Sequence, residues 1–85
     1  MNHIINEFDE IVRWPKKLAE KIDVIHWLGT KFNKYLNYSE KDINKIIKQH
    51  HTFDDIALLR RKLILNNILN RTKDGSIYWK VEKNP

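Results

Sequence analysis

The chain has no cysteine, one methionine, two glycines and two prolines among its 85 residues. Without cysteine, neither a disulfide framework nor a thiolate metal site can brace the fold, so side-chain packing has to stabilise it. With only two glycines, the chain has no glycine-rich loop to cradle a phosphate. No apolar run approaches the roughly 18 residues of a membrane span, and acidic residues stand where a signal peptide carries basic ones. We therefore expect a soluble cytoplasmic protein that does not contact a membrane.

The composition is that of one small folded domain with a basic surface. Hydrophobic residues make up 41% and aromatic residues 11%, which is enough for a core, and we expect Trp27 and Trp79 in that core. The net charge is +5, although Glu7, Asp9 and Glu10 make the first 14 residues acidic. The basic remainder favours an anionic partner, with nucleic acid first. The alternative is a lysine-rich surface that only contacts water.

Residues 1–14 carry apolar side chains at helical spacing, with polar and acidic ones between them. The apolar positions are Ile4, Ile5, Phe8, Ile11 and Val12. This pattern predicts an N-terminal amphipathic helix that ends at Trp14, because the residue before Pro15 is pushed out of helical geometry. The helix can cover the core of its own chain or meet a second copy. We accordingly divide the chain into this helix, 1–14, and a domain, 15–85.

A second helix is expected from Pro15 to about Asn33, because an apolar stripe continues through this segment. The stripe consists of Leu18, Ile22, Ile25 and Phe32, widened by Val24, Trp27 and Leu28. Gly29 lies in line with the stripe and lets another element approach closely. The segment 34–38 is short and aromatic, and predicts a brief strand.

Two capping signals predict where the next helices begin. Ser39 followed by Asp42 resembles a capping box, and Thr52 followed by Asp55 repeats the spacing. The inward faces are Ile43, Ile46 and Ile47 in the first of these helices and Ile56, Leu59 and Leu63 in the second. The asparagines at 66–67 end the last helix, because asparagine tolerates the left-handed conformation of a helix C-cap.

The pair Asp74-Gly75 predicts a hairpin turn, and two strand alignments are possible. A two-residue turn sets Leu69 opposite Lys80. A three-residue loop with Gly75 in the left-handed region sets Leu69 opposite Trp79. We prefer the second alignment because it gathers the apolar residues on one buried face. That face is Leu69, Ile77, Trp79 and Val81, and the outward face is Asn70, Thr72, Ser76, Tyr78 and Lys80.

The order helix, short strand, helix, helix and hairpin resembles a winged helix. The stretch LLRRKLILNNILNRTKDGSIYW is similar to the recognition helix and wing of bacterial winged helix-turn-helix regulators. The chain from Trp14 to Val81 further resembles an uncharacterised bacterial family, found alone or appended to helix-turn-helix transcription regulators. The matching segments are WPKK (Trp14 to Lys17), HWL before Phe32, YSEKDIN (Tyr38 to Asn44), LLRRKL (Leu58 to Leu63) and DGSIYW (Asp74 to Trp79).

The resemblance implies a mainly α fold with a C-terminal β-hairpin, winged helix-turn-helix-like and preceded by the N-terminal amphipathic helix. Two positions depart from the family pattern. Asn67 stands where a glycine usually ends the third helix, and Leu58 stands where a polar residue is usual. The first departure is tolerated for the reason given above, whereas the second alters a surface that the resemblance assigns to binding.

The winged-helix resemblance implies a non-catalytic DNA-binding function in transcription regulation. In such folds the third helix enters the major groove, while the wing and the second helix contact phosphates. The residues that map onto these contacts are Lys41, Lys45, Lys48, Arg60, Arg61, Arg71, Lys73 and Lys80. Arginine suits bidentate contact with guanine, and lysine contacts to phosphate give binding that weakens steeply with salt.

The same helix also supports an alternative function. Asp54 and Asp55 in its first turn repel phosphates, and Leu58 and Leu65 lie on the face opposite its core stripe. An apolar and acidic surface fits a protein partner, so the alternative is a protein-interaction module, or a homodimer formed through the N-terminal helix or through these leucines. Arg71 has two possible roles, since its stem can cover the indole of Trp79 instead of contacting DNA.

No constellation of an enzyme, a cofactor site or a metal site is evident. His50 and His51 with Asp54 and Asp55 are of metal-ligating types, but adjacent histidines at a helix end point in different directions and no ligand spacing recurs elsewhere. A histidine near the negative end of the second helix dipole is the simpler interpretation. His26 is expected on a helix surface.

Overall fold

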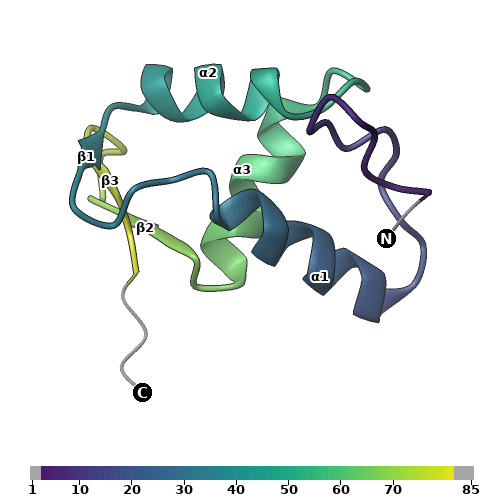
Figure 1. Cartoon of the computed structure of the whole chain (residues 1–85). Coiled ribbons are helices and arrows are strands. Elements are labelled where there is room, and N and C mark those ends of the chain that lie inside the picture. Colours follow the sequence, from purple (N-terminus) through teal and green to yellow (C-terminus); the bar gives the residue numbers. More distant parts are fainter. Residues whose placement is uncertain (1–2, 82–85) are drawn as a thin grey trace.

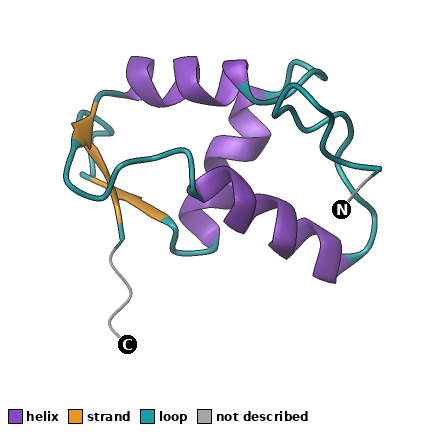
Figure 2. Cartoon of the chain, viewed as in Figure 1, coloured by secondary structure: helices purple, strands orange, loops and turns teal. Residues whose placement is uncertain are grey.

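The hairpin at the end of the chain is part of a three-stranded antiparallel sheet. The computed structural model describes residues 3–81. The elements in chain order are α1 (Leu18–Gly29), β1 (Asn37–Tyr38), α2 (Glu40–Gln49), α3 (Ile56–Leu65), β2 (Leu69–Arg71) and β3 (Tyr78–Lys80). The strand order is β1-β3-β2, so the brief strand expected within 34–38 is confirmed and supports the hairpin from outside. The sheet lies at one end of the molecule and the N-terminal loops at the other (Figures 1 and 2).

The predicted N-terminal helix is wrong for the described residues 3–14, which form turns and two isolated bridges. The side-chain oxygen of Asn6 accepts hydrogen bonds from the backbone N–H groups of Phe8 and Glu10, at 2.9 and 3.0 Å. These local bonds compete with helical ones. The apolar residues Ile4 and Ile11 nevertheless enter the core, so the segment covers its own chain. Residues 1 and 2 lie outside the described part.

The helix α1 begins at Leu18 and ends at Gly29, so it is shorter than predicted by three residues at its start and by about four at its end. Its buried face is rotated relative to the predicted stripe, because Val24, Ile25 and Leu28 are buried whereas Leu18 and Ile22 are exposed. The close approach expected at Gly29 is confirmed. A Cβ atom placed there would lie 2.6 Å from Cγ2 of Ile68.

The capping box of α2 is confirmed. The side chain of Ser39 accepts from the backbone N–H of Asp42, and the Asp42 carboxylate accepts in return from the N–H of Ser39. Ile43 and Ile47 are fully buried, and Ile46 packs at the edge of the core. This cap fixes the residue at which α2 begins, and therefore places Glu40 in its first turn.

The predicted start of α3 near Thr52 is wrong, because Asp55 is the N-cap and its carboxylate accepts from the N–H of Leu58. The link from α2 is held by buried His51, whose ring bonds the carbonyl of Ile47 through Nδ1 and the N–H of Asp55 through Nε2. The end of α3 is confirmed at 66–67, where the second asparagine has a φ of 57°.

The preferred hairpin alignment is wrong, since Leu69 lies opposite Lys80 and Arg71 opposite Tyr78. The loop has four residues, 73–76, and is closed by a bond from the N–H of Thr72 to the carbonyl of Ile77. Gly75 takes the expected left-handed conformation, with a φ of 73°. In the last strand, the alternation of buried and exposed side chains is therefore the reverse of the predicted one.

This inversion changes which aromatic residue enters the core. Tyr78 is only 2% exposed and packs in the core, whereas Ile77 is exposed and Trp79 is half-buried. Trp27, the other tryptophan expected in the core, also lies at its edge. No helix between residues 3 and 81 combines the length and apolar character needed to cross a membrane.

Candidate functional site

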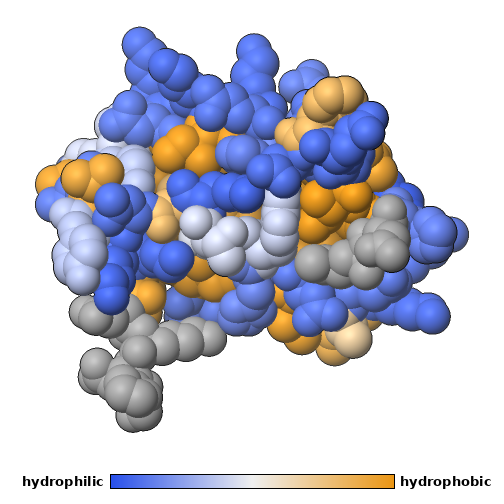
Figure 3. All heavy atoms as spheres, in the orientation of Figure 1, coloured by the Kyte–Doolittle hydropathy of each residue, from blue (hydrophilic) through white to orange (hydrophobic). Residues whose placement is uncertain are grey.

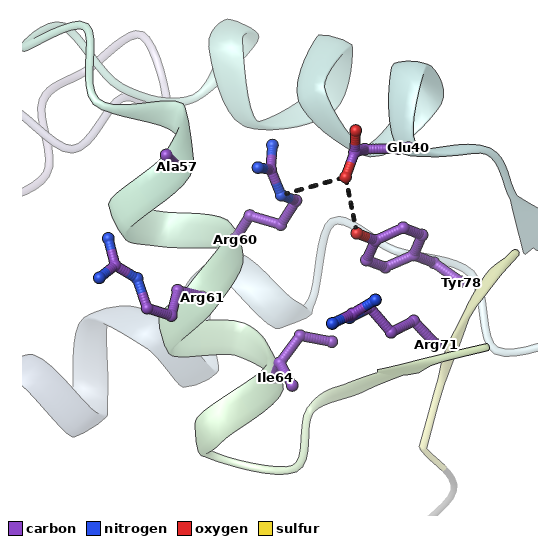
Figure 4. Close-up of a pocket in the computed structure, with 7 residues that line it drawn as sticks. All are labelled: Glu40, Ala57, Arg60, Arg61, Ile64, Arg71 and Tyr78. Carbon is purple, nitrogen blue, oxygen red and sulfur yellow. Dashed lines mark hydrogen bonds and ion pairs between the residues drawn. The ribbon is translucent and has the colours of Figure 1, made fainter. Parts of the chain in front are cut away.

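An open cleft of about 440 Å³ lies between α3, the first turn of α2 and the hairpin. Its lining residues are Glu40, Ala57, Arg60, Arg61, Ile64, Arg71 and Tyr78 (Figure 4). The lining therefore contains three arginines and one carboxylate, which gives the cleft a net positive charge. A site with this charge attracts phosphate or carboxylate groups.

The spacing of residues on α3 explains why four of them line the cleft. Ala57, Arg60, Arg61 and Ile64 recur every three or four residues and so share one side of the helix, while Leu59 and Leu63 occupy the buried side. Ala57 lies about one turn before the two arginines on this side, and its small side chain leaves room for a partner to approach the helix.

Arg60 is the most restrained of the three arginines. Its Nε lies 3.7 Å from Oε1 of Glu40, and its Nη1 donates to Oδ1 of Asn44. Both partners belong to α2, so this guanidinium connects the two helices. Its side chain is 26% exposed, and the Glu40 side chain is 51% exposed.

Glu40 has a second partner in Tyr78, whose hydroxyl donates to the same Oε1 at 3.0 Å. Figure 4 shows this carboxylate oxygen shared between the arginine and the tyrosine. Burial raises the pKa of Tyr78 above its ordinary value of 10.0, and the hydrogen bond to Glu40 raises it further. The tyrosine therefore remains a hydrogen-bond donor over the whole neutral range.

The other two arginines are more available. Arg71 is exposed and donates from Nη1 to the carbonyls of Thr72 and Lys73, each at 3.3 Å, so it braces the hairpin loop. Arg71 lies opposite Tyr78 and shares its face of the sheet, whereas Trp79 points to the other face. The alternative prediction that the Arg71 stem covers the Trp79 indole is therefore wrong. Arg61 is exposed and has no hydrogen bond or ion pair with any residue between 3 and 81.

The predicted lysines lie in three separate places. Lys73 is exposed in the hairpin loop beside the cleft, and Lys41, Lys45 and Lys48 are exposed on α2. Figure 3 shows hydrophilic atoms along the outer side of this helix. Lys80 is elsewhere, because its Nζ donates to the carbonyl of Phe32 at 3.4 Å and it lines a second hollow of about 310 Å³. The fold thus brings three predicted arginines together and leaves Lys80 apart.

Two polar lining residues, Glu40 and Tyr78, were not assigned to the site from the sequence. The acid was interpreted as a helix-terminal charge, and the tyrosine was placed outward by the wrong strand alignment. The signal for Tyr78 was the alternative alignment, which pairs it with Arg71. The sequence pattern carries no signal that brings Glu40 to the site. Among the leucines expected on the outer side of α3, Leu65 is 65% exposed but Leu58 is half-buried.

The two adjacent histidines have structural contacts. Both ring nitrogens of His51 are hydrogen bonded to backbone groups, and Nδ1 of His50 bonds the carbonyl of Asp9 at 2.8 Å. His26 lies exposed on α1 as expected. Between residues 3 and 81, no three side chains of metal-ligating types come together.

Comparison with known proteins places the chain in a family. No curated protein and no solved structure matches the chain. A family model described as "uncharacterized protein conserved in bacteria" matches residues 10–80, which includes every residue that lines the cleft. The chain therefore belongs to this bacterial family, DUF2087.

Proposed function

We propose that the protein binds double-stranded DNA without catalysis, in transcription regulation, through the arginine cleft and the exposed side of α3. The observation that carries the proposal is the meeting of Arg60, Arg61 and Arg71 from two elements in one open cleft with a single carboxylate. Such a concentration of positive charge in a concave surface suits a phosphate backbone. A role in transcription would place the protein in the bacterial cytoplasm.

The topology supports this proposal. The order of helices and strands, with β3 paired between β1 and β2, resembles that of a winged helix, in which the third helix and the hairpin act together on DNA. Here α3 and the hairpin are the two elements that supply the arginines. A winged-helix scaffold serves several functions, so the charge of the cleft rather than the scaffold carries the argument.

In this proposal, Arg61 on α3 and the basic residues of the hairpin have different roles. Arg61 has no partner within residues 3–81 and projects from α3, so it can contact a guanine edge or a phosphate. Arg71 and Lys73 on the hairpin contact phosphates. Asp54, exposed before the start of α3, opposes the approach of a phosphate there, so the duplex lies nearer the hairpin end of the helix.

A fluorescence anisotropy titration with a short labelled duplex tests the proposal. We expect binding that weakens steeply between about 50 and about 200 mM salt. Arg61→Ala should lower affinity by about three- to tenfold and reduce the salt slope by about one. Arg13→Ala is the matched control, because it removes the same charge from an exposed site outside the cleft. No binding at low salt, or equal losses in the two variants, would contradict the proposal.

One observation favours the second candidate function, a protein-interaction module. Leu65 is 65% exposed on the same helix, and Leu18 is 72% exposed on α1, where Figure 3 shows apolar atoms at the surface. Exposed apolar side chains of this size can mark contact with another protein. Sedimentation velocity over a range of concentrations tests self-association, and a dimer that Leu65→Ser dissociates would support this function. A homodimer formed through an N-terminal helix is ruled out, because residues 3–14 are not helical.

A further inference from the structure

The charge in the cleft is already partly neutralised by the protein itself. One oxygen of Glu40 lies 3.7 Å from Nε of Arg60 and 3.0 Å from the hydroxyl of Tyr78. Figure 4 shows that this carboxylate sits at the end of the cleft, between the arginine and the tyrosine. Glu40 thus occupies the position in which an incoming anion would meet these two donors.

A carboxylate and a phosphate compete for the same donors on a guanidinium group. Arg60 also donates to Asn44, so its side chain cannot turn away to serve a second anion elsewhere. The Glu40 side chain is 51% exposed, and its residue is the first of α2, so the carboxylate can turn into water at small cost. An exposed ion pair of this kind contributes little to stability.

We propose that Glu40 is an internal competitor that a DNA phosphate displaces from Arg60 and Tyr78, so that this residue limits the affinity of the cleft. The inference rests on the proposed DNA-binding function and assigns a role to a residue that opposes it. Without displacement, Arg61 and Arg71 are the two cleft arginines that contact phosphates, beside Lys73 on the hairpin loop. With displacement, Arg60 contributes a third arginine contact and the tyrosine hydroxyl donates to the same phosphate.

The closing experiment compares two variants that remove the same charge. Glu40→Gln keeps an acceptor for the tyrosine hydroxyl but no longer competes as an anion. Glu20→Gln makes the same change in the first turn of α1, whose start lies at the end of the molecule away from the hairpin (Figure 1). We expect Glu40→Gln to raise duplex affinity by about three- to tenfold at low salt, and Glu20→Gln by less than about twofold.

A double variant separates competition from a general charge effect. If Glu40 competes for Arg60, the gain from Glu40→Gln disappears in the Arg60→Ala background, because no guanidinium is left to release. A gain that persists in that background would overturn the proposal, as would equal effects of the two glutamine variants. Thermal melting of each variant shows that it is folded at the assay temperature.

The two proposals fail in different ways. If the wild-type protein binds the duplex with a steep salt dependence and Glu40→Gln has no effect, the competitor role is rejected and DNA binding stands. If the wild-type protein does not bind at low salt but Glu40→Gln does, Glu40 blocks the cleft and is not displaced, so displacement and DNA binding by the wild-type protein are both rejected. If neither protein binds, both proposals are rejected.

Discussion

At the scale of the residue, His51 joins two helices through one imidazole. Its ring bonds the carbonyl of Ile47 at 2.7 Å and the N–H of Asp55 at 2.9 Å. Because a carbonyl only accepts and an N–H only donates, the neutral ring with its proton on Nδ1 satisfies both bonds. The imidazole thus fixes the turn that carries the chain from α2 to α3, and so the angle at which the arginines of α3 face α2.

His51→Ala should therefore lower the free energy of unfolding by about 2–4 kcal/mol, from two lost buried hydrogen bonds and a cavity. The matched control is His26→Ala, which removes an exposed imidazole from α1 and should change stability by less than about 0.5 kcal/mol. Urea denaturation followed by circular dichroism measures both changes. A loss in His51→Ala no larger than in the control would contradict this role.

Asp74 is the residue at which the hairpin loop depends on pH. Hydrogen bonds from the hydroxyl of Thr72 and from the hydroxyl and N–H of Ser76 lower its pKa from 3.8 to about 2. Since the folded pKa is depressed, the carboxylate stabilises the loop above pH 3.8, and this contribution is lost as the pH falls through about 2. The group is exposed, so the effect stays local to the loop.

An NMR titration of the Asp74 carboxyl carbon should accordingly give a midpoint near 2 in the wild-type protein. Thr72→Val keeps the shape of the side chain and removes the hydroxyl that lowers the pKa most, so its midpoint should move upward toward 3.8. Lys73→Ala, at an exposed neighbour, serves as the control for a general change in charge. A wild-type midpoint at the ordinary value would show that these hydrogen bonds do not form in solution.

At the scale of the element, the hairpin shows where the sequence pattern was insufficient. Its alternation allowed two buried faces, one with Ile77 and Trp79 and one with Tyr78. Counting apolar residues favoured the first face, but the four-residue loop and the pairing of β3 with β1 select the second. The bonds within that loop are not visible in the local pattern, and the strand expected within 34–38 does not show there that it pairs with β3. The pairing of Tyr78 with Arg71, and hence the place of Tyr78 in the cleft, was missed for this reason.

The helices were predicted better because their signals are local. The capping box of α2 and the asparagines that end α3 depend on residues a few positions apart. Arg60 and Arg61 of this helix were also among the predicted contacts, and both line the cleft. The failure at residues 3–14 also has a local cause, since the bonds made by Asn6 replace helical ones that the apolar spacing predicted. Contacts between elements, such as that of Glu40 with Tyr78, require the assembled fold.

The contact between the end of α1 and the segment before β2 carries a prediction at the same scale. A Cβ at Gly29 would lie 2.6 Å from a methyl of Ile68, which is fixed on a branched carbon and cannot swing away. Gly29→Ala should lower the free energy of unfolding by about 1–3 kcal/mol, although alanine is the better helix former. In a double-mutant cycle, Gly29→Ala/Ile68→Ala should lose less stability than the two single variants added together, because the shorter side chain at 68 relieves the clash. Additive losses would mean that the two residues do not touch.

At the scale of the whole molecule, the N-terminal segment is held by the junction between α2 and α3. The N–H of Ile11 donates to the carbonyl of His50 at 2.8 Å, and its carbonyl accepts from the N–H of Thr52 at 3.0 Å. Beside these bonds, Lys31 of the turn after α1 lies over the ring of Trp27 and pairs with Asp9. The segment therefore contacts two helical regions, and we expect it to unfold together with them.

The two apolar residues Phe8 and Ile11 distinguish this arrangement from the amphipathic helix that their spacing predicted. A helix would use both on one face, whereas here Ile11 is fully buried and Phe8 is 71% exposed. Ile11→Ala should therefore lower the free energy of unfolding of the whole domain by about 2–5 kcal/mol, and Phe8→Ala by less than about 0.5 kcal/mol. Coincident urea transitions by tryptophan fluorescence and circular dichroism would show that one cooperative unit responds. Equal losses in the two variants would support the predicted helix, in which both residues share one buried face. An unchanged transition for Ile11→Ala would show that the segment does not contribute to the core.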